Sequence, residues 1–518
     1  MSNTKTIARN TGWYGLEKII GDILTFFTSI AIARTLGPSK MGYIIFVAYI
    51  ASVVSSLGGF GIPATAQKYT AEFLGMGDRG TARHIFIRSM FFQIALATLA
   101  TAGAVYWVLG DANAGYKLAS VLVALSIWPI MVNSVPAQAN VAMEEMARNL
   151  PASVISIFFF AVSIAATLIF KWGIVGVGAS MLLTRLIDFL IRLIPTTKHI
   201  LSWEKAYVHP PGLRERMISF AWQSVATMVL AMIVWDRSEF FLLHKKTLCT
   251  DIRQIAYYSV AFSMAERLLI TSTVFGSASG ATIFAQFGRD KSKLASITAS
   301  TFRYLALTSI PVHFIAAALA FPALLLLYGN QYRDAAMVVT LAPLLCMPKA
   351  FISPVQYLLQ SAERQSYVIL ATVLAGIFDL GVAWCLIPRH GAVGACIGSG
   401  VGQVTAVGIM WAIGIHLYKV KLPWLQIAKI TFASALASLT AHYIAIRLAP
   451  IWAIPCGGIA SLAVLFGLFY LMRALEPEDS ARFGILTGML PKPIAVPANK
   501  LMSLLIRPGL ADATPTNV

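Results

Sequence analysis

Charged residues are scarce in this sequence. Only 12% of its 518 residues are Asp, Glu, Lys or Arg, whereas an ordinary soluble domain has about 25%. Acidic residues are the scarcer kind, since 22 Asp and Glu stand against 40 Lys and Arg, a net charge of +18. The composition excludes an ordinary soluble globular protein.

Cysteine is also rare, with five copies scattered along the chain and no Cys-x-x-Cys pair. This pattern excludes a disulfide framework and a zinc-binding cysteine site. The eight histidines show no metal-ligand spacing either. The glycine-rich run GIVGVGAS (173–180) follows no strand pattern, so it is not a dinucleotide-binding loop. We therefore expect no metal and no cofactor.

Hydrophobic residues make up 58% of the chain and occur in long runs divided by short polar breaks. A helix needs about 20 apolar residues to cross the hydrocarbon core of a membrane. The sequence therefore predicts an all-α polytopic membrane protein with about 14 transmembrane helices. The predicted spans are 12–34, 42–64, 84–109, 117–139, 149–170, 173–195, 217–243, 255–283, 299–327, 335–358, 366–387, 391–416, 425–448 and 451–472.

The topology follows from the distribution of basic residues. With the N-terminus inside, the cytoplasmic segments hold about twice as many Lys and Arg residues as the outer loops, as the positive-inside rule requires. We therefore expect both termini in the cytoplasm. This bias also explains most of the net positive charge, so nucleic-acid binding is not expected. The polar start, MSNTKTIARNTG, leads into a full-length span and does not resemble a cleaved signal peptide.

Similar motifs recur at a spacing of about 214–219 residues, in the same order along the chain. YKLASVLVAL (116–125) corresponds to YRDAAMVVTL (332–341), and KWGIVGVG (171–178) to RHGAVGAC (389–396). A repeat of six spans gives both halves the same topology, as in transporters with parallel repeats. The predicted regions are an N-terminal six-helix lobe (1–195), a cytoplasmic linker (196–216), a C-terminal six-helix lobe (217–416), an extra helix pair (417–472) and a cytoplasmic tail (473–518).

Four motifs carry a resemblance to a known family. RTLGPSKMGYIIF (34–46) is followed by GGFGIPATAQKYTAEF (58–73), while WDRSEFFL (235–242) and LYGNQYRDAA (327–336) lie in the second half. The sequence resembles the Wzx-type polysaccharide flippases of the multidrug/oligosaccharidyl-lipid/polysaccharide exporter superfamily. HKKTLCTDIRQIAYY (244–258) departs from the family, which usually repeats Leu-Gly-Pro there.

The resemblance implies a bacterial inner-membrane protein without enzymatic activity. It would translocate undecaprenyl-pyrophosphate-linked oligosaccharide for O-antigen, lipopolysaccharide or other surface polysaccharide, in contact with membrane lipids and with polysaccharide polymerase machinery. A drug/cation antiporter and a lipid II flippase of the same superfamily are the alternatives. The outer loops are short, which disfavours a membrane glycosyltransferase or polymerase.

Several basic residues lie within the apolar runs. A Lys or Arg at the centre of a spanning helix costs about 2.5–3.5 kcal/mol, so such residues usually face an aqueous interior. Arg185, Arg267 and Lys349 lie deepest, whereas Arg88 and Arg303 lie close enough to span ends to snorkel to the interface. The residues predicted to bind the anionic substrate are Arg185, Arg267, Lys349, Arg88, Arg303 and Lys18.

Guanidinium groups suit a pyrophosphate because they donate paired, charge-assisted hydrogen bonds to phosphate oxygens. Alternatively, the same cations form salt bridges with acidic residues inside the protein. Arg185, Asp188 and Arg192 share one helical face, and Pro348 predicts a kink beside Lys349. The acids predicted to form salt bridges or to bind a coupling proton or sodium ion are Asp22, Asp236, Asp188, Glu266 and Asp379.

Overall fold

The computed structural model describes residues 2–110, 116–204, 210–235, 237–362 and 364–475. Their regular structure is helical, and no strand occurs within these ranges. The chain divides into two compact units, Met1–Ala256 and Tyr257–Val518. The predicted all-α class is therefore confirmed.

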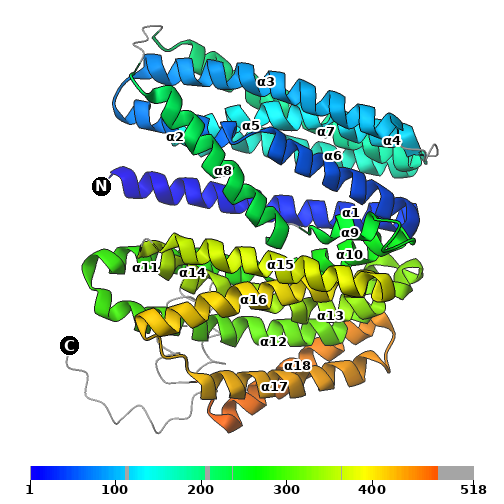
Figure 1. The fold of residues 1–518 in the computed structure, drawn as a ribbon. Coiled ribbons are helices and arrows are strands. Elements are labelled where there is room, and N and C mark those ends of the chain that lie inside the picture. The colour runs from blue at the N-terminus through cyan, green and yellow to red at the C-terminus, as the bar shows by residue number, and fades with distance from the viewer. Residues whose placement is uncertain (1, 111–115, 205–209, 236, 363, 476–518) are drawn as a thin grey trace. The chain divides into compact units, whose positions relative to one another are not determined.

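Long helices lying side by side form the first unit (Figure 1). α6 reads LPASVISIFFFAVSIAATLI and is apolar on every face, as expected of a helix surrounded by lipid and other helices. The proline in its first turn lacks only an N–H that would have no partner inside the helix. The elements are α1 (Ser2–Gly58), α2 (Ile62–Gly75), α3 (Arg79–Gly110), α4 (Lys117–Leu125), α5 (Ile127–Ala142), η2 (Met146–Asn149), α6 (Leu150–Ile169), α7 (Gly173–Leu201), α8 (Leu213–Trp235) and α9 (Glu239–His244).

α10 (Arg253–Leu268) crosses into the second unit, where a similar order of elements occurs. The pair α15 and α16 packs closely, and α17 and α18 pack against α12. The elements are α11 (Ile270–Arg289), η3 (Lys291–Lys293), α12 (Leu294–Tyr328), η4 (Asn330–Ala335), α13 (Ala336–Cys346), η5 (Met347–Phe351), α14 (Ile352–Ser361), α15 (Gln365–His390), α16 (Ala392–Tyr418), α17 (Trp424–Ala445) and α18 (Pro450–Met472).

Two segments of the repeated order are interrupted at corresponding positions. In the first half, α1 ends at Gly58 before α2, and Ser126 separates α4 from α5. In the second half, Leu269 separates α10 from α11, and the 3-10 helix η5 separates α13 from α14. Pro348 lies within η5, so the interruption predicted beside Lys349 is present. The lobe boundaries at 195 and 217 stay predictions; α7 continues to Leu201.

The glycine-rich motif GGFGIP marks the interruption between α1 and α2. The prediction was one span over 42–64 with a kink, but the helix ends at Gly58 and resumes at Ile62. Phe60 and Gly61 have φ values of 47° and 68°, in the left-handed region that ends a right-handed helix. A Cβ placed on Gly61 would lie 2.5 Å from the carbonyl oxygen of Ala221, so only glycine lets α2 and α8 approach this closely.

Eleven helical segments in the described ranges are long and apolar enough to cross a membrane. The multi-pass membrane class is confirmed, but the count of fourteen is not. The first two predicted spans form one segment, Gly21–Gly58, in which Gly37 (φ 71°) marks a kink. Predicted span 255–283 is divided between α10 and α11. The helix α17 (Trp424–Ala445), at the place of predicted span 425–448, is not among the eleven.

Candidate functional site in the membrane-spanning helices

Asp188 is the centre of a polar network inside the first unit. Its Oδ1 accepts a hydrogen bond from Arg192 Nη2 at 2.8 Å, and its Oδ2 accepts one from Asn133 Nδ2 at 2.6 Å. The side chains of Arg192 and Asp188 are only 11% and 13% exposed. Arg192 Nη2 also donates to Ser153 Oγ at 3.1 Å. The network therefore joins α5, α6 and α7 through one ion pair.

A second, uncharged network lies farther along the same helices. Thr196 Oγ1 on α7 donates to Asn140 Oδ1 on α5 at 3.1 Å. Asn140 Nδ2 in turn donates to Asn149 Oδ1 at 2.8 Å, and Asn140 is fully buried. Buried polar groups are expensive unless they are hydrogen-bonded. The two networks therefore fix α7 against α5 in one rotation and register.

Arg185 lies on α7 about one turn before Asp188 but outside this network. It is exposed, and it makes no hydrogen bond or ion pair with any residue that the structure describes. It is also near the middle of α7 (Gly173–Leu201), far from both ends of the helix. A cation at this depth is costly in lipid. A cation at such a position usually faces water, a nearby acid such as Asp188 one turn away, or an anionic ligand.

Lys349 and Glu266 come together in the second unit, where both belong to interrupted helices. Lys349 Nζ lies 3.8 Å from Glu266 Oε1, and the two side chains are 26% and 35% exposed. Lys349 is in η5, and Glu266 is in the last turn of α10. Arg267, the next residue, is half-buried. Lys349 had two predicted roles, substrate binding and salt-bridge formation. Its contact with Glu266 fits the salt bridge.

The corresponding residues Arg88 and Arg303 have different environments. Arg88 is exposed on α3, whereas Arg303 on α12 is only 7% exposed. The guanidinium carbon of Arg303 lies 5.8 Å from the ring centre of its neighbour Tyr304. The equivalence of their positions in the two halves therefore does not extend to their surroundings.

Asp379 is fully buried in α15, where α16 approaches it closely. A Cβ on Gly402 would lie 2.7 Å from Asp379 Cβ, and one on Gly398 would lie 2.9 Å from the Asp379 carbonyl oxygen. Glycine in α16 thus makes room for a carboxylate between two membrane-length helices. Asp22 is half-buried on α1. Asp236 and the side chain of Lys18 lie outside the part of the chain that the structure describes.

One ion pair connects α2 to α8. Arg216 Nη2 lies 2.9 and 3.1 Å from the two carboxylate oxygens of Glu72. Arg216 also lies over the ring of Tyr69, and Lys68 lies 4.0 Å from the ring centre of Phe220. Together with the close approach of Gly61 to Ala221, these contacts hold α2 against α8 within the first unit.

Comparison with known sequences identifies the family. The profile of a family described as "Polysaccharide biosynthesis protein" matches residues 31–337, which is more than half of the chain. The chain belongs to this family. No curated protein matches the sequence.

Solved structures of similar fold include transporters of one superfamily. A structure titled "Lipid II flippase MurJ, inward closed conformation" matches with a TM-score of 0.70 and 12% identity, covering 88% of this chain and 98% of the other. An inward-facing MATE multidrug resistance transporter of the MOP superfamily matches with a TM-score of 0.61 and 14% identity, covering 77% and 94%. At these identities the likeness establishes the shared fold.

Sequence reasoning about this polysaccharide biosynthesis protein missed the neutral members of the networks. Asn133 and Asn140 are seven residues apart in an otherwise apolar span, and this spacing places them on one helical face. That pattern was the available signal. Ser153 and Thr196 had none, because such residues are common in membrane helices. Within the described ranges, no group of three or more His, Cys, Asp or Glu residues is placed to hold a metal ion.

Proposed function

We propose that the protein is a flippase that moves undecaprenyl-pyrophosphate-linked oligosaccharide across the bacterial cytoplasmic membrane for surface polysaccharide synthesis. Membership of the polysaccharide biosynthesis family and the fold of the MOP superfamily support transport of a lipid-linked sugar. The observation that carries the proposal is Arg185, an exposed cation in the middle of a membrane-length helix that makes no hydrogen bond or ion pair with a described residue.

The chemistry of Arg185 fits an anionic headgroup. A guanidinium presents a planar set of donors that matches phosphate oxygens, and its charge is permanent. The buried ion pair of Asp188 and Arg192 holds α7 in the rotation that presents Arg185. Arg185 therefore contacts the pyrophosphate in this proposal, while Asp188 and Arg192 position the helix. Arg267 and Lys349 stay predicted substrate contacts of the second unit, in which Lys349 already lies beside Glu266.

Translocation proceeds by alternating access, in which the two halves expose the headgroup site first to one side of the membrane and then to the other. The interrupted helices supply places where such a movement bends the chain at low cost, because backbone hydrogen bonds are already broken there. Both termini are cytoplasmic in this proposal. Asp22 and Asp236 are the proposed sites for a coupling proton or sodium ion, and polymerase machinery is the proposed partner.

Export of organic cations requires an acidic or aromatic cavity. Asp188, the acid nearest Arg185 on α7, already accepts hydrogen bonds from Arg192 and Asn133, so it is not available to a cationic drug. Lipid II also carries a pyrophosphate and a polyprenyl chain. The structure titled as a lipid II flippase has the same fold, so this substrate is the second candidate.

Complementation of two bacterial strains distinguishes these functions. One strain lacks its polysaccharide flippase and the other can be depleted of its lipid II flippase. We expect this protein to restore surface polysaccharide in the first strain and not growth in the second. An Arg185→Ala variant should fail in the first strain, whereas the matched control Lys171→Ala, which changes an exposed cation in the turn before α7, should succeed. Rescue of growth in the second strain alone would favour lipid II.

A further inference from the structure

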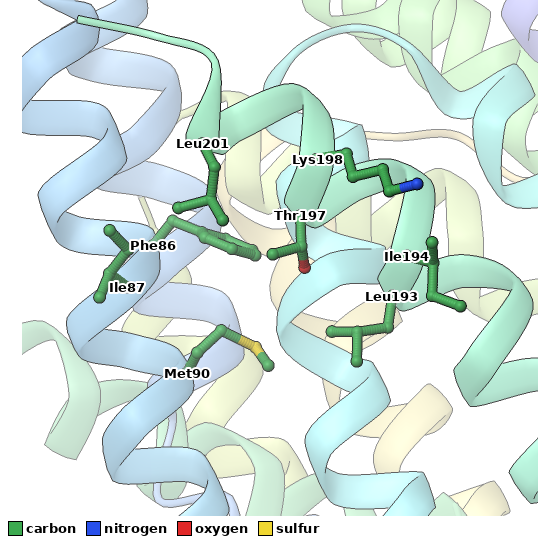
Figure 2. Close-up of a pocket in the computed structure, with 8 residues that line it drawn as sticks. All are labelled: Phe86, Ile87, Met90, Leu193, Ile194, Thr197, Lys198 and Leu201. Atoms are coloured by element: carbon green, nitrogen blue, oxygen red, sulfur yellow. The ribbon is translucent and has the colours of Figure 1, made fainter. Parts of the chain in front are cut away.

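An apolar groove of about 510 Å³ lies between α3 and α7, away from the charged networks (Figure 2). It occupies the first third of α3 and the last third of α7. Both helices are long and apolar enough to span a membrane. The lining residues are Phe86, Ile87, Met90, Leu193, Ile194, Thr197, Lys198 and Leu201.

The groove opens on the surface that faces lipid. Ile87, Ile194 and Leu201 line it and are 41%, 50% and 45% exposed. Phe86 closes its inner wall and is only 2% exposed, because it packs into the core of the unit. Six of its eight lining side chains are apolar, so in a bilayer hydrocarbon is the expected filling of this recess.

Lys198 is the basic residue in the lining of the groove, and Arg83 on α3 lies near the lining residues in sequence. The stem of Lys198 follows the lining, and Figure 2 shows its amine directed away from Phe86, as in snorkelling. Arg83 lies about one turn before Phe86 and Ile87, on the same face of α3. Its Nε is buried, and Arg83 makes no hydrogen bond or ion pair with any described residue.

Lys198 likewise has no acidic partner in the described chain. No acidic side chain lines the groove. An anionic lipid has two parts that fit here. Its phosphate suits the two cations, which have no acidic partner among the described residues, and its acyl chain suits the apolar groove. A lipid without net charge would fill the groove but would leave the two cations uncompensated.

We propose that this groove binds one acyl chain of an anionic membrane phospholipid, with Arg83 and Lys198 as the contacts of its phosphate. The positive-inside rule places this end of α3 and α7 at the cytoplasmic leaflet, where anionic lipids attract basic residues. The lipid is a bound partner of the first unit and not the translocated substrate. The proposal is therefore independent of which headgroup the protein transports.

Native mass spectrometry of the purified, delipidated protein measures this site directly. Phosphatidylglycerol and phosphatidylcholine with identical chains are titrated, and undecaprenyl phosphate is a third arm. We expect wild-type protein to prefer phosphatidylglycerol. Each of Lys198→Gln and Arg83→Gln should weaken its binding about 5-fold, and the double variant about 30-fold, which corresponds to about 1 kcal/mol per cation.

Two further variants separate the parts of the site. Ile87→Trp fills the groove from an exposed position and should reduce binding of phosphatidylglycerol and phosphatidylcholine alike. Lys171→Gln removes an exposed cation near the start of α7, at its other end, and should leave the preference intact. Equal binding of both phospholipids to wild-type protein, or an unchanged preference in the double variant, would overturn the proposal. So would stronger binding of undecaprenyl phosphate, abolished by Ile87→Trp, since the groove would then hold a polyprenyl chain.

Discussion

Arg185 and Asp188 lie one turn apart on α7, yet their replacement by alanine should have opposite consequences. Arg185→Ala should reduce transport and leave the amount of protein in the membrane unchanged. Asp188→Ala should reduce the amount of folded protein. The difference arises because Asp188 accepts hydrogen bonds from two donors, Arg192 and Asn133, whereas Arg185 makes no hydrogen bond or ion pair with a described residue.

The magnitudes follow from what each change leaves behind. Without Asp188, the guanidinium of Arg192 stays 11% exposed with its charge uncompensated, and breaking a buried ion pair in this way costs about 3–5 kcal/mol. Without Arg185, a substrate phosphate loses a charge-assisted hydrogen bond of about 1.5–3 kcal/mol. Transport limited by substrate capture should then fall about 10- to 150-fold. Arg185→Lys should recover only part of the loss, because an ammonium cannot form the paired contact.

The assay is surface polysaccharide in a flippase-deficient strain, divided by the amount of protein in the membrane. The thermal midpoint of the purified variants in detergent gives a second, independent measure of folding. In the double variant Asp188→Ala/Arg192→Met, the buried charge is gone, so protein amount should recover relative to Asp188→Ala. If Arg185→Ala lowers protein amount as much as Asp188→Ala does, or if its normalised transport is normal, the assignment of Arg185 to the substrate is wrong.

Other predictions concern the packing and the topology of the chain. Gly402→Ala should lower the thermal midpoint, because its Cβ would overlap α15 at 2.7 Å and overpacking costs about 1–3 kcal/mol. The control Gly408→Ala, with nothing within 4 Å, should be neutral or stabilising by up to about 1 kcal/mol. Gly61→Ala should destabilise more than Gly77→Ala in the same measurement, since both have positive φ but only Gly61 meets a backbone carbonyl. Reporter domains fused after Val518 and before Met1 should both report a cytoplasmic location; a periplasmic signal from either contradicts the predicted topology.

Much of the helical architecture could be predicted from local sequence. Apolar runs of about 20 residues gave the spans because the membrane sets the length of a helix, and Pro348 gave the interruption beside Lys349. The interruption at Leu269 was not predictable in this way. The surrounding residues, RLLITS, contain neither glycine nor proline, so the break depends on packing between helices and not on local preference.

The candidate site was harder to predict because helical spacing gives neighbours on one helix only. The spacing of Arg185, Asp188 and Arg192 correctly placed them on one face, but it could not decide which cation Asp188 binds. Asn133, 55 residues away on α5, takes one carboxylate oxygen, and Arg192 takes the other. Arg185 is therefore not the ion-pair partner of Asp188. The contact with Asn133 that decides this comes from another helix, so it could not be predicted from the spacing on α7.

The polar network around Asp188 also constrains how the protein is made. An isolated α7 would bring three ionised side chains into the bilayer, at about 2.5–3.5 kcal/mol for each charge at its centre. Synthesis proceeds from the N-terminus, so α5 and α6, which carry Asn133 and Ser153, leave the ribosome before α7 does. Their side chains are thus in place when Asp188 and Arg192 arrive. We therefore expect α7 to insert into the membrane together with α5 and α6. A truncated chain that begins after α6 should leave α7 in the aqueous phase.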